Sequence, residues 1–148
     1  MKKLSFLLSL ALIIGIMIPA VHATSDVYRE TDIIHTEFGD FEIETVTVIH
    51  SLTSRSGSKS ADKTQTVKFS GKTIGEVTLS ATFGYDGKTA WVSSASGSHT
   101  TYDKWSYGSE DITKSGGTAK LTATLSRILY RDVPLTITIT CSPTGQVS

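Results

Sequence analysis

Strict alternation of apolar and polar residues is the feature that most limits what this chain can fold into. The alternation is clearest in residues 76–83, and it returns in residues 119–126 and 133–141. A period of two residues puts every second side chain on the same face of a strand. The pattern therefore predicts antiparallel strands that turn one apolar face to a core and one polar face to water.

Turn signals separate these alternating segments. Asp86-Gly87 lies between two strand-like segments and predicts a tight hairpin, because both central residues of such a turn need a positive φ. Gly116-Gly117 predicts a second tight turn. About seven short strands, with turn signals roughly every 8–12 residues, predict an all-β fold. We expect an antiparallel, immunoglobulin-like β-sandwich, with a small closed β-barrel as the alternative.

The N-terminal part of the chain departs from this regularity. Residues 41–49 are rich in β-branched residues, but their alternation changes phase near Thr45, which predicts a strand with a bulge or a bend. Residues 24–40 are acidic and show little periodicity, as mobile termini often do. We therefore place the sandwich domain at 41–148, preceded by an acidic segment that is either flexible or folded back onto the body.

The first 23 residues have the pattern of a cleavable signal peptide. Lys2 and Lys3 precede an apolar run at residues 4–18, and Val21-His22-Ala23 supplies small residues at the −3 and −1 positions of a cleavage site. The run is shorter than the ~20 residues that a bilayer span needs. We expect cleavage after Ala23, a secreted (extracellular) protein, and no membrane span in the mature chain.

Charge gives few hints about a partner. The whole chain has 14 basic and 14 acidic residues, and removal of Lys2 and Lys3 with the leader leaves a net charge of −2. A near-neutral domain gives no case for binding nucleic acid. The acids are concentrated at residues 24–50, where Arg29 is the only Lys or Arg, so we expect an acidic segment beside a mildly basic body.

The chain has one cysteine, which excludes an internal disulfide. Cys141 ends the alternating segment 135–141, so we expect a buried thiol in the core. Pairing between two chains is the alternative.

Several segments together resemble a family of small secreted β-rich proteins from gut-dwelling Gram-positive bacteria, a domain of unknown function. They are residues 63–67 (KTQTV), 75–83 (GEVTLSATF), 85–90 (YDGKTA) and 137–145 (ITITCSPTG). The resemblance covers most of residues 60–148. It implies a secreted β-sandwich and carries over no active site.

Aromatic residues supply the candidate binding site. Both tryptophans and three tyrosines lie within residues 85–107. Aromatic side chains beside polar loops give a large contact area at low entropic cost, which suits recognition of a protein or a glycan. The candidate binding residues are Tyr102, Trp105, Tyr107 and Trp91, with one of the two tryptophans expected in the core.

Catalytic and metal sites are weaker hypotheses. His99 and Asp103 lie near several serines and could form a triad, and Asp103, Glu110 and Asp111 could meet around calcium. We expect no cofactor and no metal. The leading functional hypothesis is a secreted, non-enzymatic binding domain for an unknown protein or glycan at a cell surface. A bacteriocin-like or toxin-like factor is second, and a secreted hydrolase is third.

Overall fold

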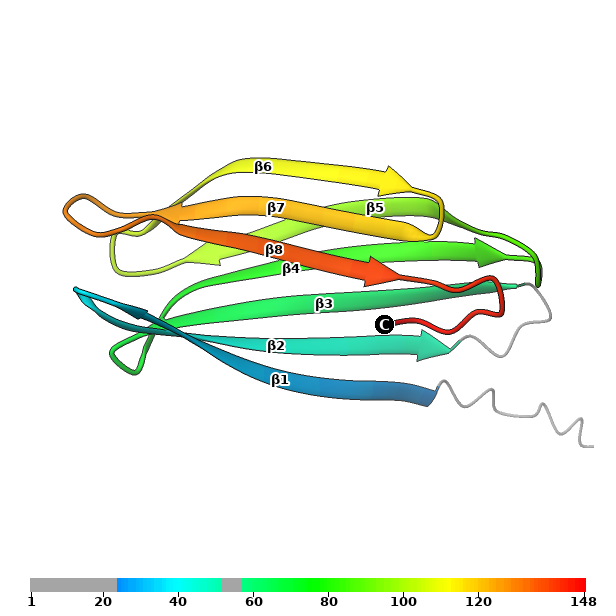
Figure 1. Cartoon of the computed structure of the whole chain (residues 1–148), viewed down its shortest axis with the longest axis horizontal. Helices are drawn as coiled ribbons and strands as arrows, with labels where there is room; N and C mark the ends of the chain where they lie inside the picture. The colour runs from blue at the N-terminus through cyan, green and yellow to red at the C-terminus, as the bar shows by residue number, and fades with distance from the viewer. Residues whose placement is uncertain (1–23, 52–56) are drawn as a thin grey trace, which may run out of the picture.

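Two antiparallel sheets pack face to face in the computed structural model, which describes residues 24–51 and 57–148 (Figure 1). The larger sheet contains β1 (Thr24–Thr36), β2 (Gly39–Ser51), β3 (Ser58–Phe69), β4 (Lys72–Tyr85) and β5 (Ala90–Thr101). The smaller sheet contains β6 (Ser106–Ser115), β7 (Thr118–Ser126) and β8 (Val133–Thr140). The predicted sandwich is confirmed, with eight strands in the described residues instead of about seven.

Strands that follow one another in the sequence are also neighbours in each sheet, in the orders β1-β2-β3-β4-β5 and β6-β7-β8. Each sheet is therefore a meander of hairpins, whereas immunoglobulin domains use Greek-key connections. The loop between β5 and β6 carries the chain from one sheet to the other. No strand pairing joins the two sheets among the described strands, so the closed-barrel alternative is wrong.

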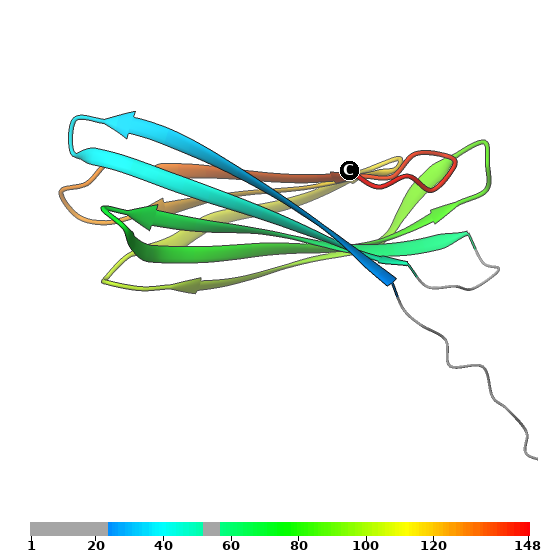
Figure 2. The same cartoon turned by 90° about the horizontal axis from the view of Figure 1, so that it is seen from below.

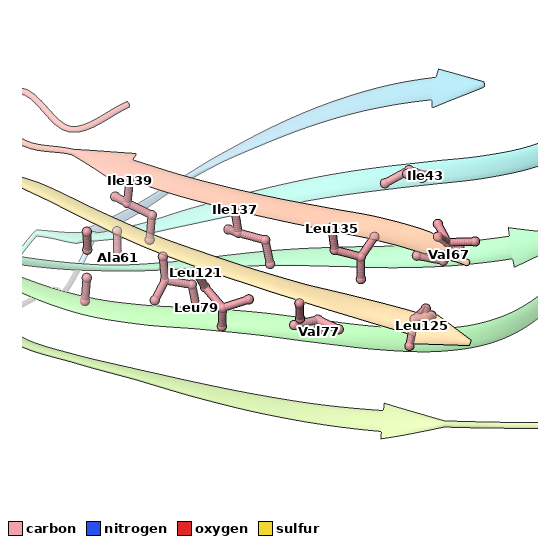
Figure 3. Packing of buried hydrophobic residues seen from close by; sticks show 14 of the residues in the cluster. Ile43, Ala61, Val67, Val77, Leu79, Leu121, Leu125, Leu135, Ile137 and Ile139 are labelled. Carbon is pink, nitrogen blue, oxygen red and sulfur yellow. The ribbon is translucent and has the colours of Figure 1, made fainter. Parts of the chain in front are cut away.

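The inner faces of the two sheets form one hydrophobic core (Figure 3). The residues that alternate in the sequence are the buried ones: Val77, Leu79, Ala81 and Phe83 of β4, Ala119 to Leu125 at odd positions of β7, and Val133 to Ile139 at odd positions of β8. Cys141 continues this series, is buried and has a free thiol, so its predicted place in the core is confirmed.

β2 corrects the predicted bulge near Thr45. Odd-numbered residues from Phe41 to Ile49 all face the core, and the pairing with both neighbours runs through Thr45 without a shift. Register shifts occur elsewhere, as between Val67 and Lys68 of β3. The apparent change of phase arises because β2 carries valines on its outer face and threonines at two inner positions. Val46 and Val48 lie half-buried on that outer face.

β1 is the second correction, because the acidic segment expected outside the sandwich contains a full strand of the larger sheet. β1 pairs with β2 along its whole length, from Thr24↔Ser51 to Thr36↔Gly39. Among the described strands β2 is its only neighbour, and residues 25–35 are exposed. Figure 2 shows β1 running diagonally across the strands behind it, as expected for a twisted sheet. Since neither face of β1 is buried, packing imposes no alternation on its sequence.

The predicted signal peptide at residues 1–23 lies outside the described residues. Cleavage after Ala23 and export therefore stay predictions. Within residues 24–51 and 57–148 there is no helix long and apolar enough to cross a membrane.

Candidate functional site

Trp105 belongs to the core. Its side chain is only 4% exposed and packs edge-on against Phe41, with ring centroids 5.9 Å apart, and against Tyr130 at 5.8 Å. The indole Nε1 is buried and has no hydrogen-bond partner. A side chain held in this way supports the end of the sandwich and offers no surface to a ligand.

The two candidate tyrosines have different environments. Tyr102 is exposed in the β5–β6 loop, where its backbone N–H donates to the Ile74 carbonyl at 3.0 Å. Tyr107 on β6 is half-buried and stacks on the ring of His99, with centroids 3.8 Å apart. Its hydroxyl donates to Glu110. Burial and, after it, this hydrogen bond raise the pKa of Tyr107, so its hydroxyl stays protonated.

Trp91 is the second residue of β5, whereas Trp105 follows the end of β5, and Figure 1 shows β5 running from one end of the sandwich to the other. Trp91 is paired with Gly84 of β4, and a Cβ atom added to Gly84 would lie 2.3 Å from Cε2 of the indole. The ring thus covers a glycine and remains 46% exposed. The structure brings Tyr102 and Trp105 to one loop but separates both from Trp91, so the four residues do not form one surface.

The described residues show no arrangement of side chains that supports the catalytic or the metal hypothesis. His99 is stacked on Tyr107, and no hydrogen bond joins it to Asp103 among those of the described residues. In the same part of the chain, no three His, Cys, Asp or Glu side chains gather closely enough to hold a metal ion.

A groove that the sequence did not reveal runs between β1 and the edge of the smaller sheet. A hollow of about 530 Å³ is lined by Tyr28 and Glu30 of β1, Ile49 of β2, and Thr138 and Thr140 of β8, among others. An adjoining hollow of about 400 Å³ shares Tyr28 and Ile49 and adds Asp26 and Lys59. We call this continuous surface the β1–β8 groove.

Three acids of β1 face the groove side of the sheet. Asp26, Glu30 and Asp32 pair with Ile49, Thr45 and Ile43, which are buried on the inner face of β2. Directly paired residues of antiparallel strands point to the same face. None of the ion pairs between described residues involves these three carboxylates, which are also exposed.

Two lysines of β3, which lies in the same sheet as β1, also line the groove. Lys59 and Lys63 of β3 line the two hollows, and the Lys63 ammonium donates to the Thr138 carbonyl at 3.1 Å. Gln65 donates in the same way to the Thr136 carbonyl at 3.2 Å. The acids of β1 therefore lie beside two lysines of β3.

The fold and the groove define an all-β sandwich with an uncovered strand at one edge. No protein-family model, curated protein or solved structure matches this chain. The resemblance to a secreted family of Gram-positive bacteria therefore stays a prediction.

Proposed function

We propose that the chain is an exported, non-enzymatic binding domain, and that its partner is an extended protein segment that adds to the free edge of β1. The observation that carries the proposal is the length and regularity of this edge. β1 forms an unbroken ladder with β2, and its other edge has no neighbouring strand in the described residues.

Free strand edges are usually protected, because their unpaired N–H and C=O groups invite another strand. Short length, proline, bulges and inward-pointing charged residues are common means of protection. β1 has 13 residues, contains no proline and shows no shift in register, so its protection rests on the inner-face acids Asp26, Glu30 and Asp32, which repel only a partner of like charge. The free edge of β8 differs, because Gln65 and Lys63 donate to its carbonyls and Pro134 lacks an N–H.

The side chains of β1 favour a basic partner. The inner face of β1 presents Asp26, Glu30 and Asp32, with the side chain of Tyr28 between Asp26 and Glu30 and that of Ile34 after Asp32. Opposite charges on paired residues stabilise a sheet, and like charges destabilise it. The best partner is therefore a strand with Lys or Arg at alternate positions and apolar residues near Tyr28 and Ile34.

The same acids disfavour a second copy of the chain. If two copies paired their β1 strands edge to edge about a two-fold axis, the strands would be antiparallel and the inner faces of both sheets would lie on the same side. Even-numbered residues of one β1 would then pair with even-numbered residues of the other. In every such register that pairs two thirds or more of β1, one of the acids Asp26, Glu30 and Asp32 lies opposite one of these acids in the second copy. A foreign basic strand meets no such repulsion.

The test uses labelled peptides as long as β1 and the protein segment 24–148, which contains both sheets. We expect fluorescence anisotropy to detect binding of a peptide that alternates Lys with Val, and no binding of its Glu counterpart. Methylation of the peptide's backbone nitrogens along one edge should abolish binding, because strand addition needs those donors.

Variants of β1 locate the contact. Glu30→Lys combined with Asp32→Lys should weaken binding about tenfold, since two favourable charge pairs become repulsive. Thr31→Lys is the matched control, because Thr31 pairs with Glu44 on the outer face of the sheet. An equal loss with Thr31→Lys, or equal binding of the Lys and Glu peptides, would show that strand addition at this face does not occur.

A further inference from the structure

The loop between β7 and β8 exposes two adjacent aliphatic side chains. Ile128 and Leu129 are each 88% exposed, more than any other large apolar residue described. Single apolar residues on a surface are common, but two neighbours at the end of a loop are a larger departure from ordinary surfaces.

The backbone of this loop holds Leu129 in a position that favours glycine. The Tyr130 N–H donates to the Arg127 carbonyl at 3.0 Å and closes a four-residue turn. Leu129 is the third residue of that turn and has a φ of 70°. A positive φ at this position is the mark of a type II turn, where glycine is the usual residue. The chain therefore keeps a large apolar side chain in water at a site where glycine would relieve strain.

A third exposed apolar side chain packs near Tyr130, the residue that follows this pair in the chain. Phe38, in the turn between β1 and β2, is 49% exposed, and its ring centroid is 6.4 Å from that of Tyr130. Figures 1 and 2 both show the β1–β2 turn and the β7–β8 loop as the two segments that reach furthest at this end of the sandwich. We call Phe38, Ile128 and Leu129 the apolar tip.

Basic side chains line two hollows at the same end of the sandwich. A hollow of about 500 Å³ is lined by Lys72, Lys104 and Arg127, with Asp103 as its only acid. A second hollow of about 360 Å³ joins Ile128 to Lys104 and Arg127, with Asp132 as its only acid. The cations thus outnumber the acids in the lining of each hollow, and Lys104 and Arg127 share the second hollow with Ile128, whereas the charged neighbour of Phe38 in the chain is Glu37.

This combination fits a lipid surface better than a protein. Apolar side chains that project from loop ends can enter the acyl region, while neighbouring Lys and Arg side chains remain at the level of the headgroups. A second copy of the chain is a poor occupant, because three side chains cannot approach the roughly 800 Å² per partner of a stable interface.

We propose that the apolar tip inserts into the interface of a phospholipid bilayer, and that Lys72, Lys104 and Arg127 bind the phosphates of anionic headgroups there. This binding is separate from strand addition at β1, since the two surfaces share no residue.

Co-sedimentation with lipid vesicles tests the proposal. The protein used is the segment 24–148, which holds both sheets and the whole described core, because the apolar run at residues 4–18 would itself bind lipid. We expect binding to vesicles of equimolar phosphatidylcholine and phosphatidylglycerol, and weaker binding to phosphatidylcholine alone. Ile128→Ser should lower the partition coefficient about tenfold to a hundredfold, the effect of one large aliphatic side chain.

Leu129→Gly separates binding from folding. This variant removes the strained left-handed leucine, so its thermal midpoint should equal or exceed that of the wild type, while its vesicle binding falls about as much as with Ile128→Ser. Val27→Ser is the matched control, because Val27 is an exposed apolar residue of β1 and should leave vesicle binding unchanged. Lys104→Glu should weaken binding to the mixed vesicles about tenfold.

Three results would overturn the proposal. The first is no sedimentation with either vesicle, including the case in which the apolar tip instead captures a soluble protein. The second is wild-type vesicle binding by both Ile128→Ser and Leu129→Gly. The third is equal binding to charged and uncharged vesicles, which would remove the role of the three cations.

Discussion

Replacement of Trp105 gives the sharpest test of the packing at the loop end of the sandwich. Truncation of a buried aromatic residue to alanine costs about 3–5 kcal/mol, from lost transfer free energy and the cavity left behind. Trp105 is 4% exposed and makes aromatic contacts with Phe41 and Tyr130. An aromatic pair contributes about 0.5–1.5 kcal/mol to stability in addition to the effect of its buried area. We therefore expect Trp105→Ala to cost about 4–5 kcal/mol.

Trp105→Phe should cost much less. Phenylalanine keeps one ring against Phe41 and Tyr130, and it removes the buried indole N–H that has no hydrogen-bond partner. Burial of such a group costs about 1–3 kcal/mol, which offsets most of the lost apolar area. The expected net change in the free energy of unfolding is below about 1.5 kcal/mol.

Urea unfolding followed by far-UV circular dichroism measures both variants without relying on tryptophan fluorescence. With an m-value of about 1.5 kcal/mol/M, Trp105→Ala should lower the urea midpoint by about 3 M. If the free energy of unfolding of the wild type is smaller than the cost of this substitution, the variant will be unfolded without urea. Trp105→Phe then supplies the comparison. A cost below about 1 kcal/mol for Trp105→Ala, or equal costs for both variants, would refute the packing described here.

Three further predictions concern single groups. Gly84→Ala should destabilise the protein by about 1–2 kcal/mol, because the new Cβ would displace the Trp91 indole that covers Gly84. The displaced indole should fluoresce at longer wavelength, and unchanged emission would contradict this contact. Hydrogen bonds from two backbone N–H groups of its turn lower the pKa of Asp86. Asp86→Ala should therefore destabilise the protein above about pH 4, and the difference from the wild type should vanish as pH falls through the lowered pKa of the folded state. Thermal midpoints of both proteins across that pH range check the sign. Burial raises the pKa of the Cys141 thiol, so Ellman's reagent at pH 8 should react slowly with the native protein and rapidly in urea, and fast native reaction would place the thiol at the surface.

The parts of the fold that the sequence predicts well are those covered on one side by the other sheet. Residues 77–83 and 135–141 alternate because one face of each strand packs in the core and the other meets water. The hairpin at Asp86-Gly87 was predictable in place but not in turn type, because the loop spans residues 86–89 and only Gly87 of the two predicted central residues has a positive φ. In these places, the physical constraint acts on neighbouring residues and leaves a local pattern.

The parts that sequence alone misses depend on partners distant in the chain. β1 shows no alternation because, in the part of the chain that the structure describes, no strand of the smaller sheet covers it. Trp105 lies in a loop, where no strand period indicates which way a side chain points, and its place in the core depends on Phe41 and Tyr130. Trp91 turns away from the core and over Gly84, a contact fixed only by the pairing of β4 with β5.

The meander order of the two sheets also bears on how quickly the chain can fold. All-β sandwiches are usually slow folders, because strands from distant parts of the sequence must meet before any contact compensates for the entropy of loop closure. Here each strand pairs with the one before it or after it, so six hairpins can close over short loops before the sheets meet. Only the docking of β6-β7-β8 onto the larger sheet requires a long-range search, and that step buries the core.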